Sequence, residues 1–178
     1  MKKCIYSAAL VSALILGACG DTTEENIGGT VEENGAEVNS AETSATTENE
    51  STDDAVNEIN QVIVDNANVK ATLLKITKVT DVIWGNSYEV IFDVENKRSE
   101  NIEVQARSVS ADGRMIDDML LSMSQEVAPG KSAYATLKIS EFDGYEFPEL
   151  KSDFEMTLHI FSWDNYDYTD DHPVKVTF

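Results

Sequence analysis

The sequence predicts an all-β fold over residues 59–178, an antiparallel β-sandwich of seven or eight strands. Three observations support this prediction. Apolar and polar residues alternate with a period of two in six separate runs. Turn sequences rich in Gly, Asn or Pro separate these runs. One of the turns contains Asp112-Gly113, a pair that is typical of tight hairpins.

Each run places its apolar residues on one face of a strand, because successive side chains of a strand point to opposite faces. In chain order, these faces are Val69, Ala71 and Leu73; Tyr88, Val90, Phe92 and Val94; Ile102, Val104 and Ala106; Ala133, Ala135, Leu137 and Ile139; Phe154, Met156, Leu158 and Ile160; and Val174, Val176 and Phe178. Residues 115–123 are expected to add a strand with Met115, Met119 and Met123 in the core. Residues 141–150 have room for a helical turn that Pro148 keeps short.

The N-terminus has the pattern of a secretory signal. Lys2 and Lys3 precede an apolar stretch over residues 5–18, which as a helix covers about 21 Å and is shorter than a hydrocarbon core of ~30 Å. This length favours a signal peptide over a membrane span. Leu16-Gly17-Ala18-Cys19 then resembles the bacterial lipobox. The resemblance implies cleavage between Ala18 and Cys19, a diacylglyceryl group on the Cys19 thiol, and acyl chains such as palmitate that hold the protein on the extracytoplasmic face of the cell membrane.

Residues 20–58 differ in composition from the rest of the chain. Twelve of the 33 acidic residues lie there, with no Lys or Arg. Such a segment buries too little apolar surface to offset its ordering entropy, which predicts a disordered acidic tether. An acidic arm for a basic partner is the alternative. The expected organisation is therefore a signal peptide (1–18), a lipidated Cys19 with its tether (19–58) and one β-domain (59–178).

The charge of the β-domain restricts its partners. Residues 59–178 contain 21 acidic and 11 basic residues, a net charge of about 10 negative. Nucleic acid binding is excluded, because phosphates require a basic surface. Charge-driven binding to anionic lipid is disfavoured for the same reason. Cys4 lies in the predicted signal, so no cysteine remains after Cys19 for a disulfide or a thiol nucleophile.

Four stretches resemble immunoglobulin-like domains of unknown function from secreted proteins and lipoproteins of Gram-positive bacteria. They are VDNANVKATLLKI, ENIEVQARSVSADGRMID, VAPGKSA and FEMTLHIFSWDNYD, within residues 60–178. The resemblance implies an immunoglobulin-like sandwich in an extracellular location. It brings no catalytic residues. The chain lacks the cysteine pair around a buried tryptophan that antibody domains have, so only the architecture is implied.

Candidate sites for chemistry are few. His159 and His172 are the two histidines, and neither stands in a nucleophile motif, so an enzyme is not expected. The acidic segment DNYDYTDDH offers oxygen ligands for Ca²⁺ from Asp164, Asp167, Asp170 and Asp171, although its spacing is not that of an EF-hand. Solvated carboxylates are the simpler interpretation, and no cofactor is expected.

Aromatic residues in or beside the predicted loops are the best candidates for a contact surface. They are Trp84, Tyr145, Phe147, Trp163, Tyr166 and Tyr168. Such residues either bind a partner or close the ends of a small core. Trp163, Tyr166 and Tyr168 are the preferred contacts.

The sequence thus predicts a non-catalytic lipoprotein that binds an envelope protein or wall component. One alternative is a solute- or Ca²⁺-binding lipoprotein. Another is a lipid-anchored accessory or exclusion factor of an envelope system.

Overall fold

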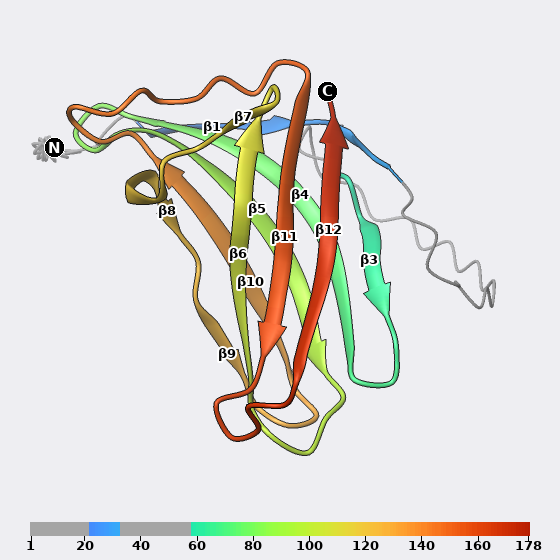
Figure 1. The fold of residues 1–178 in the computed structure, drawn as a ribbon. Helices are drawn as coiled ribbons and strands as arrows, with labels where there is room; N and C mark the ends of the chain where they lie inside the picture. The colour runs from blue at the N-terminus through green and yellow to red at the C-terminus, as the bar shows by residue number, and fades with distance from the viewer. Residues whose placement is uncertain (1–21, 33–57) are drawn as a thin grey trace, which may run out of the picture.

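The structure is a computed structural model that describes residues 22–32 and 58–178. Two antiparallel sheets pack face to face as a sandwich (Figure 1). The first sheet has the order β1-β4-β5-β10-β8, and β3 also pairs with β4. Its strands are β1 (Thr22–Ile27), β3 (Gln61–Asp65), β4 (Val69–Asp81), β5 (Gly85–Asn96), β8 (Leu121–Ser122) and β10 (Ser132–Ser140).

The second sheet has the order β2-β12-β11-β6-β7, and β9 also pairs with β6. Its strands are β2 (Thr30–Val31), β6 (Ile102–Ala111), β7 (Arg114–Met115), β9 (Gln125–Val127), β11 (Asp153–Phe161) and β12 (Thr169–Thr177). The immunoglobulin-like all-β sandwich predicted from the sequence is confirmed. The described residues form more strands than the seven or eight expected, because short edge strands with little apolar content pair with the long ones.

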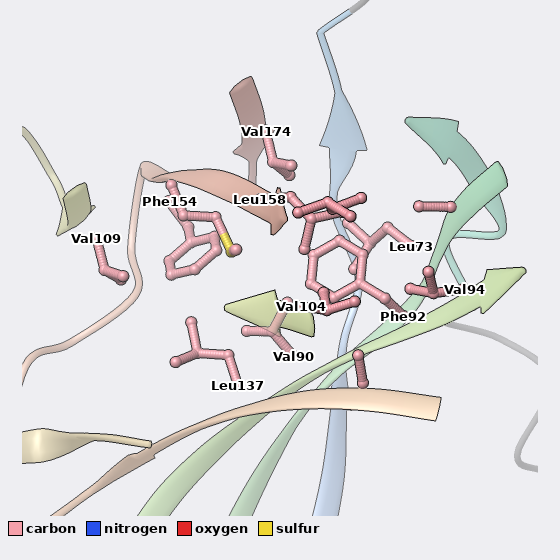
Figure 2. Close-up of a cluster of buried hydrophobic side chains, with 14 of the residues drawn as sticks. Leu73, Val90, Phe92, Val94, Val104, Val109, Leu137, Phe154, Leu158 and Val174 are labelled. Carbon is pink, nitrogen blue, oxygen red and sulfur yellow. The ribbon is translucent and has the colours of Figure 1, made fainter. Parts of the chain in front are cut away.

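The period-two alternation correctly predicts which residues of the long strands are buried in the core. Along β11 every second residue from Phe154 to Ile160 is buried, and the residues between them are partly exposed. Phe92 of β5 and Phe154 of β11 are fully buried and belong to opposite sheets. Figure 2 shows Leu73, Phe92, Leu158 and their neighbours filling the space between the layers. This single apolar layer stabilises the domain, since buried apolar area is the main favourable term in folding.

The structure of residues 22–32 differs from the predicted disordered tether. They form β1 and β2, which pair with the edges of the two sheets. The composition misses these strands because an edge strand needs mainly backbone hydrogen bonds, and four of the six residues of β1 are exposed. Ile27 and Val31 supply the apolar contacts, packing against the core from its rim. The rest of the predicted tether, residues 33–57, and the predicted signal and lipobox lie outside the described residues.

Two smaller predictions are wrong. Residues 141–150 contain turns and irregular backbone with no helix. The expected strand over residues 115–123 is broken by a short 3₁₀ helix, η2 (Asp118–Leu120), where the Asp117 side chain accepts a hydrogen bond from the backbone N–H of Met119. As a result, Met115 and Met119 are exposed, and of the three methionines only Met123 packs against the core.

Candidate functional site

Loops from both sheets meet at one end of the sandwich. The β3–β4 turn (66–68), the β5–β6 loop (97–101) and the β11–β12 loop (162–168) lie there, and we call this region the loop end. It is opposite the end where β1 begins and where β4 turns into β5 (Figure 1). Because sandwich loops carry binding residues in many proteins, this end is the main candidate for a binding site.

A buried asparagine organises the β5–β6 loop. Asn96 is fully buried at the end of β5. Its Nδ2 donates to the carbonyl oxygens of Glu100 at 2.9 Å and Val127 at 2.8 Å, and its Oδ1 accepts from the backbone N–H of Arg98 at 2.9 Å. The amide therefore satisfies three backbone groups and ties the loop to β9, as a buried polar group must be satisfied to be tolerated.

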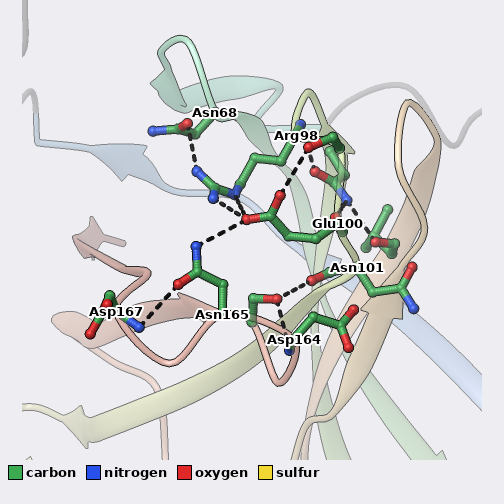
Figure 3. Close-up of polar contacts among 11 residues, drawn as sticks. Asn68, Arg98, Glu100, Asn101, Asp164, Asn165 and Asp167 are labelled. Atoms are coloured by element: carbon green, nitrogen blue, oxygen red, sulfur yellow. Dashed lines mark hydrogen bonds and ion pairs between the residues drawn. The ribbon is translucent and has the colours of Figure 1, made fainter.

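Arg98 is the centre of the polar network (Figure 3). Its guanidinium pairs with the Glu100 carboxylate, and Nη1 donates to Asn68 Oδ1 at 2.9 Å. The hydrogen bond from Arg98 is the main reason that the pKa of Glu100 lies below its usual value. The side chains of this pair are only 18% and 21% exposed, so their attraction is screened less than that of a surface pair. The network links turns of the two sheets.

The β11–β12 loop is held against this network from the other side. Asn165 Nδ2 donates to Glu100 Oε1 at 3.3 Å, and the Asn165 carbonyl accepts from the backbone N–H of Tyr168 at 3.0 Å. The buried Ser162 hydroxyl donates to the Asn101 carbonyl at 2.7 Å. The loop is thus fixed at both of its ends before any ligand arrives, which reduces the entropy cost of binding.

Tyr168 is part of this support and not of the surface. It is 9% exposed, and the Arg98 guanidinium carbon lies 3.8 Å from its ring centroid, a cation–π contact. Burial raises the pKa of the Tyr168 hydroxyl to about 12, with the Asp170 charge adding to the effect. Of the three predicted contact residues, Tyr168 therefore closes the core, the second of the two roles considered for the loop aromatics.

Trp163 and Tyr166 are the accessible aromatics of the loop end. Their side chains are 60% and 81% exposed. The Trp163 ring meets Phe161 edge to face at 4.8 Å, which steadies it on the outer surface of the second sheet. Phe161 in turn lies 5.0 Å from the His159 ring. The exposed carboxylates of Asp164 and Asp167 flank the two aromatics.

The four aspartates proposed as Ca²⁺ ligands do not converge. Asp170 and Asp171 are consecutive in β12, so their side chains point to opposite faces of the sheet. Asp170 Oδ1 lies 2.9 Å from His172 Nε2, and Asp171 Oδ1 lies 2.5 Å from His159 Nδ1. Within residues 22–32 and 58–178, no group of three or more His, Cys, Asp or Glu side chains is placed to hold a metal ion.

His159 serves as a cross-strand partner, whereas His172 and its partner Asp170 lie on the same strand, β12. His159 on β11 is opposite Asp171 on β12 in the register, which explains their contact. As the alternation predicts, His159 lies on the face of β11 away from the buried core residues.

The remaining predicted aromatics lie at the other end of the sandwich and have different roles. Phe147 is partly buried and stacks on Tyr88, with ring centroids 5.2 Å apart. Trp84 is 82% exposed in the β4–β5 turn. Tyr145 is less exposed and meets Phe142 at 5.8 Å. The structure thus separates the six aromatics between two ends.

Sequence reasoning missed the residues that hold the loop end together. Asn96, Arg98 and Glu100 fall in or beside a segment that the sequence marks only as a turn. The one available signal is the pair of opposite charges two residues apart. Their partners Asn68 and Asn165 are 30 and 65 residues away in the chain, so only the tertiary structure brings them together.

Comparisons with known proteins add little to this geometry. No family model matches the chain, and no curated protein does. A solved structure, the crystal structure of a FixG-related protein from Vibrio parahaemolyticus, is similar over 50% of this chain and 75% of that chain, with a TM-score of 0.31 and 12% identity. Among the described residues, no helix is long and apolar enough to cross a membrane.

Proposed function

We propose that this chain is a bacterial lipoprotein, anchored through Cys19 on the outer face of the cell membrane, that presents a non-catalytic immunoglobulin-like domain. The loop end is its binding surface, and the partner is an envelope protein or a wall component. The observation that carries the proposal is the pair of exposed aromatics, Trp163 and Tyr166, on a loop already fixed by Asn165 and Ser162. Exposed aromatics on a rigid loop are typical of binding hot spots.

The position of the loop end supports this function. Cys19 is three residues before Thr22, where β1 begins at the end of the sandwich opposite the loops. A lipid anchor at Cys19 therefore leaves Trp163 and Tyr166 on the side of the domain that faces away from the membrane. The flanking Asp164 and Asp167 favour a partner surface with Lys or Arg side chains, or with sugar hydroxyls, beside apolar area.

The test is a cross-linking pull-down with the full mature chain, residues 19–178, against envelope extract and separately against purified cell wall of the host. We expect one enriched species that is lost with Trp163→Ala and Tyr166→Ala. The matched control is Tyr134→Ala, because Tyr134 is 69% exposed on β10 of the first sheet, whereas Trp163 and Tyr166 follow β11 of the second. Enrichment that Tyr134→Ala removes equally, or no enrichment from either source, contradicts the proposed binding surface.

The anchor has a separate test. Labelled fatty acid should enter the wild-type protein in the host and should not enter Cys19→Ala. Label that persists in Cys19→Ala contradicts lipidation at this residue.

A further inference from the structure

An exposed apolar surface covers the tip of the first sheet. The β4–β5 turn presents Val82, Ile83 and Trp84, which are 78%, 73% and 82% exposed. Phe142 and Tyr145 lie in the segment after β10 and are also exposed. We call these five residues the apolar tip. Three consecutive large apolar side chains facing water are unusual in a folded domain and mark a surface that something covers.

The two parts of the apolar tip are joined by specific contacts. Glu141, the residue before Phe142, accepts hydrogen bonds from both the backbone N–H and the side-chain amide of Asn86, each at 2.9 Å. Gly85, between Trp84 and Asn86, has φ of +79°, a conformation that favours glycine. The segment containing Phe142 is therefore fixed beside the β4–β5 turn.

The β4–β5 turn is closed by hydrogen bonds to its own aspartate. Asp81 Oδ1 accepts from the backbone N–H groups of Ile83 at 2.7 Å and Trp84 at 2.9 Å. Such an aspartate closes a turn through its own side chain and leaves the following side chains pointing outward. The local structure thus holds these apolar residues outside the core.

The start of β1 locates this tip relative to the proposed anchor. Thr22 is opposite Asp81 in the register, and its hydroxyl donates to Asp81 Oδ2 at 2.8 Å. Cys19 is three residues earlier, so at full extension its α carbon lies within about 11 Å of that of Thr22. A lipid on Cys19 would therefore keep the apolar tip within reach of the bilayer surface.

We propose that the apolar tip inserts into the interfacial region of the lipid bilayer, as a second membrane contact beside the lipidated Cys19. The inference rests on the proposed function, because the anchor brings the tip to the membrane. Trp84 and Tyr145 suit this depth, since their rings have an apolar body and a polar group. Two contacts, the anchor and the tip, fix the orientation of the domain and direct the loop end away from the membrane.

The charges around the apolar tip specify the kind of lipid surface. Neither residues 79–87 nor residues 139–147 contain a Lys or Arg, and Asp143 follows Phe142. The nearest cations include Lys138, whose charge acts on Asp81, and Arg114, which pairs with Glu146. Because carboxylates offset these charges, we expect little attraction to anionic headgroups, and insertion depends on apolar burial. Insertion should occur in zwitterionic vesicles and should be insensitive to salt.

The two tryptophans allow a direct test, because Trp84 is in the apolar tip and Trp163 is at the loop end. The full mature chain is purified from its host in acylated form and reconstituted into phosphatidylcholine vesicles that contain lipids brominated on the acyl chains. Trp163→Phe leaves Trp84 as the sole tryptophan reporter, and Trp84→Phe leaves Trp163 as the matched control. Flotation and mass spectrometry establish that each variant is acylated and bound to vesicles.

We expect the brominated lipids to quench Trp84 by at least twofold and Trp163 by less than a tenth, with no change between 50 mM and 500 mM NaCl. Acylated protein that floats with the vesicles while Trp84 remains unquenched overturns the inference and leaves the lipid anchor intact. Protein from the host that carries no acyl group overturns the anchor, and with it the inference.

A protein partner is the alternative occupant of the apolar tip. Iodide quenching in native membranes distinguishes the two cases, because iodide reaches only tryptophans exposed to water. Trp84 should be shielded equally in phosphatidylcholine vesicles and in native membranes. Shielding in native membranes alone indicates a protein on the tip and overturns bilayer insertion.

Discussion

The two ends of the sandwich are built on different principles. At the loop end, charged and amide side chains bind one another across the two sheets, with Arg98 and Glu100 at the centre. At the apolar tip, one turn is closed by the Asp81 carboxylate and presents large apolar side chains to the outside. The same scaffold thus carries a preorganised polar network at one end and an exposed apolar surface at the other.

This difference indicates the surroundings of each end. A network of hydrogen-bonded side chains keeps a loop in one shape in water, which suits recognition of a partner. Burial of the apolar tip in a lipid surface is favourable, because it removes apolar area from water. An anchor at Cys19 would place the apolar tip near the membrane and the loop end far from it, so the asymmetry of the domain matches its proposed attachment.

The largest expected effect is a loss of stability when the polar network of the loop end is disrupted. Asn96→Ala removes the buried amide and leaves the carbonyls of Glu100 and Val127 and the Arg98 N–H without this partner. One unsatisfied buried group costs ~1–3 kcal/mol. Because the three groups share one site, their costs should not add in full, and we expect the free energy of unfolding to fall by about 3 kcal/mol. The matched control is Asn86→Ala beside the apolar tip, which should cost about 1 kcal/mol or less. Urea denaturation measures both, and equal losses would contradict the comparison.

Ionisation of Tyr168 should make the stability of the fold depend on pH in the alkaline range. Its folded pKa of about 12 exceeds the ordinary tyrosine pKa of 10.0, so the folded state holds this proton more tightly than the unfolded state does. The stability contribution is present in full below pH 10 and is lost as the pH rises toward 12, by about 2 to 3 kcal/mol. Ultraviolet titration should show a tyrosine ionising near 12 that disappears in Tyr168→Phe. An unchanged titration curve in this variant would contradict the assignment.

The two exposed tryptophans, Trp163 and Trp84, should contribute differently to the stability of the fold. Trp163→Ser loses the edge-to-face contact with Phe161 and should cost about 1 kcal/mol of stability in solution. Trp84→Ser removes a side chain that is 82% exposed and should change stability by less than about 0.5 kcal/mol. Thermal unfolding of both variants without lipid checks the difference. A larger loss from Trp84→Ser would show that the apolar tip stabilises the fold itself.

Acid should weaken both ends through carboxylates whose pKa values are lowered. Hydrogen bonds from the backbone N–H groups of Trp84 and Ile83 lower the pKa of Asp81, and a hydrogen bond from Arg98 lowers that of Glu100. Both groups stabilise the fold above their unfolded pKa values, near 4, and this contribution is lost as the pH falls through the folded values. We expect Asp81→Asn and Glu100→Gln each to lose less stability between pH 5 and pH 3 than the wild type. An unchanged acid profile in either variant would contradict the role of that residue.

The smallest expected effect concerns Ca²⁺ at the loop end. Because Asp170 and Asp171 point to opposite faces and Asp164 and Asp167 are exposed, the four carboxylates provide no common site. We expect 5 mM Ca²⁺ to move the midpoint of thermal unfolding by less than about 1 °C, as for a few independent surface carboxylates. Scanning calorimetry with Mg²⁺ as the matched control checks this. A Ca²⁺-specific rise of several degrees would contradict the placement of these aspartates.

The sequence alone determined the long strands and the core. Alternation with a period of two fixes which side chains of a strand share a face, because the geometry of the strand has the same period. The buried residues of β5, β10 and β11 follow the predicted faces almost without exception. The turn at Asp112-Gly113 was also predictable, because both residues adopt positive φ, which this pair tolerates.

Tertiary structure decided what alternation cannot encode. β1 has no apolar face, and its pairing with β4 depends on an edge that exists only when the sheet has formed. This pairing brings Thr22, at the start of β1, beside the turn that carries the apolar tip. The partners of Arg98 come from loops far apart in the chain, and the burial of Tyr168 beside exposed Trp163 and Tyr166 follows from that packing. Local patterns specify which face of a strand is buried, whereas the contacts between distant segments determine which loop residues face water.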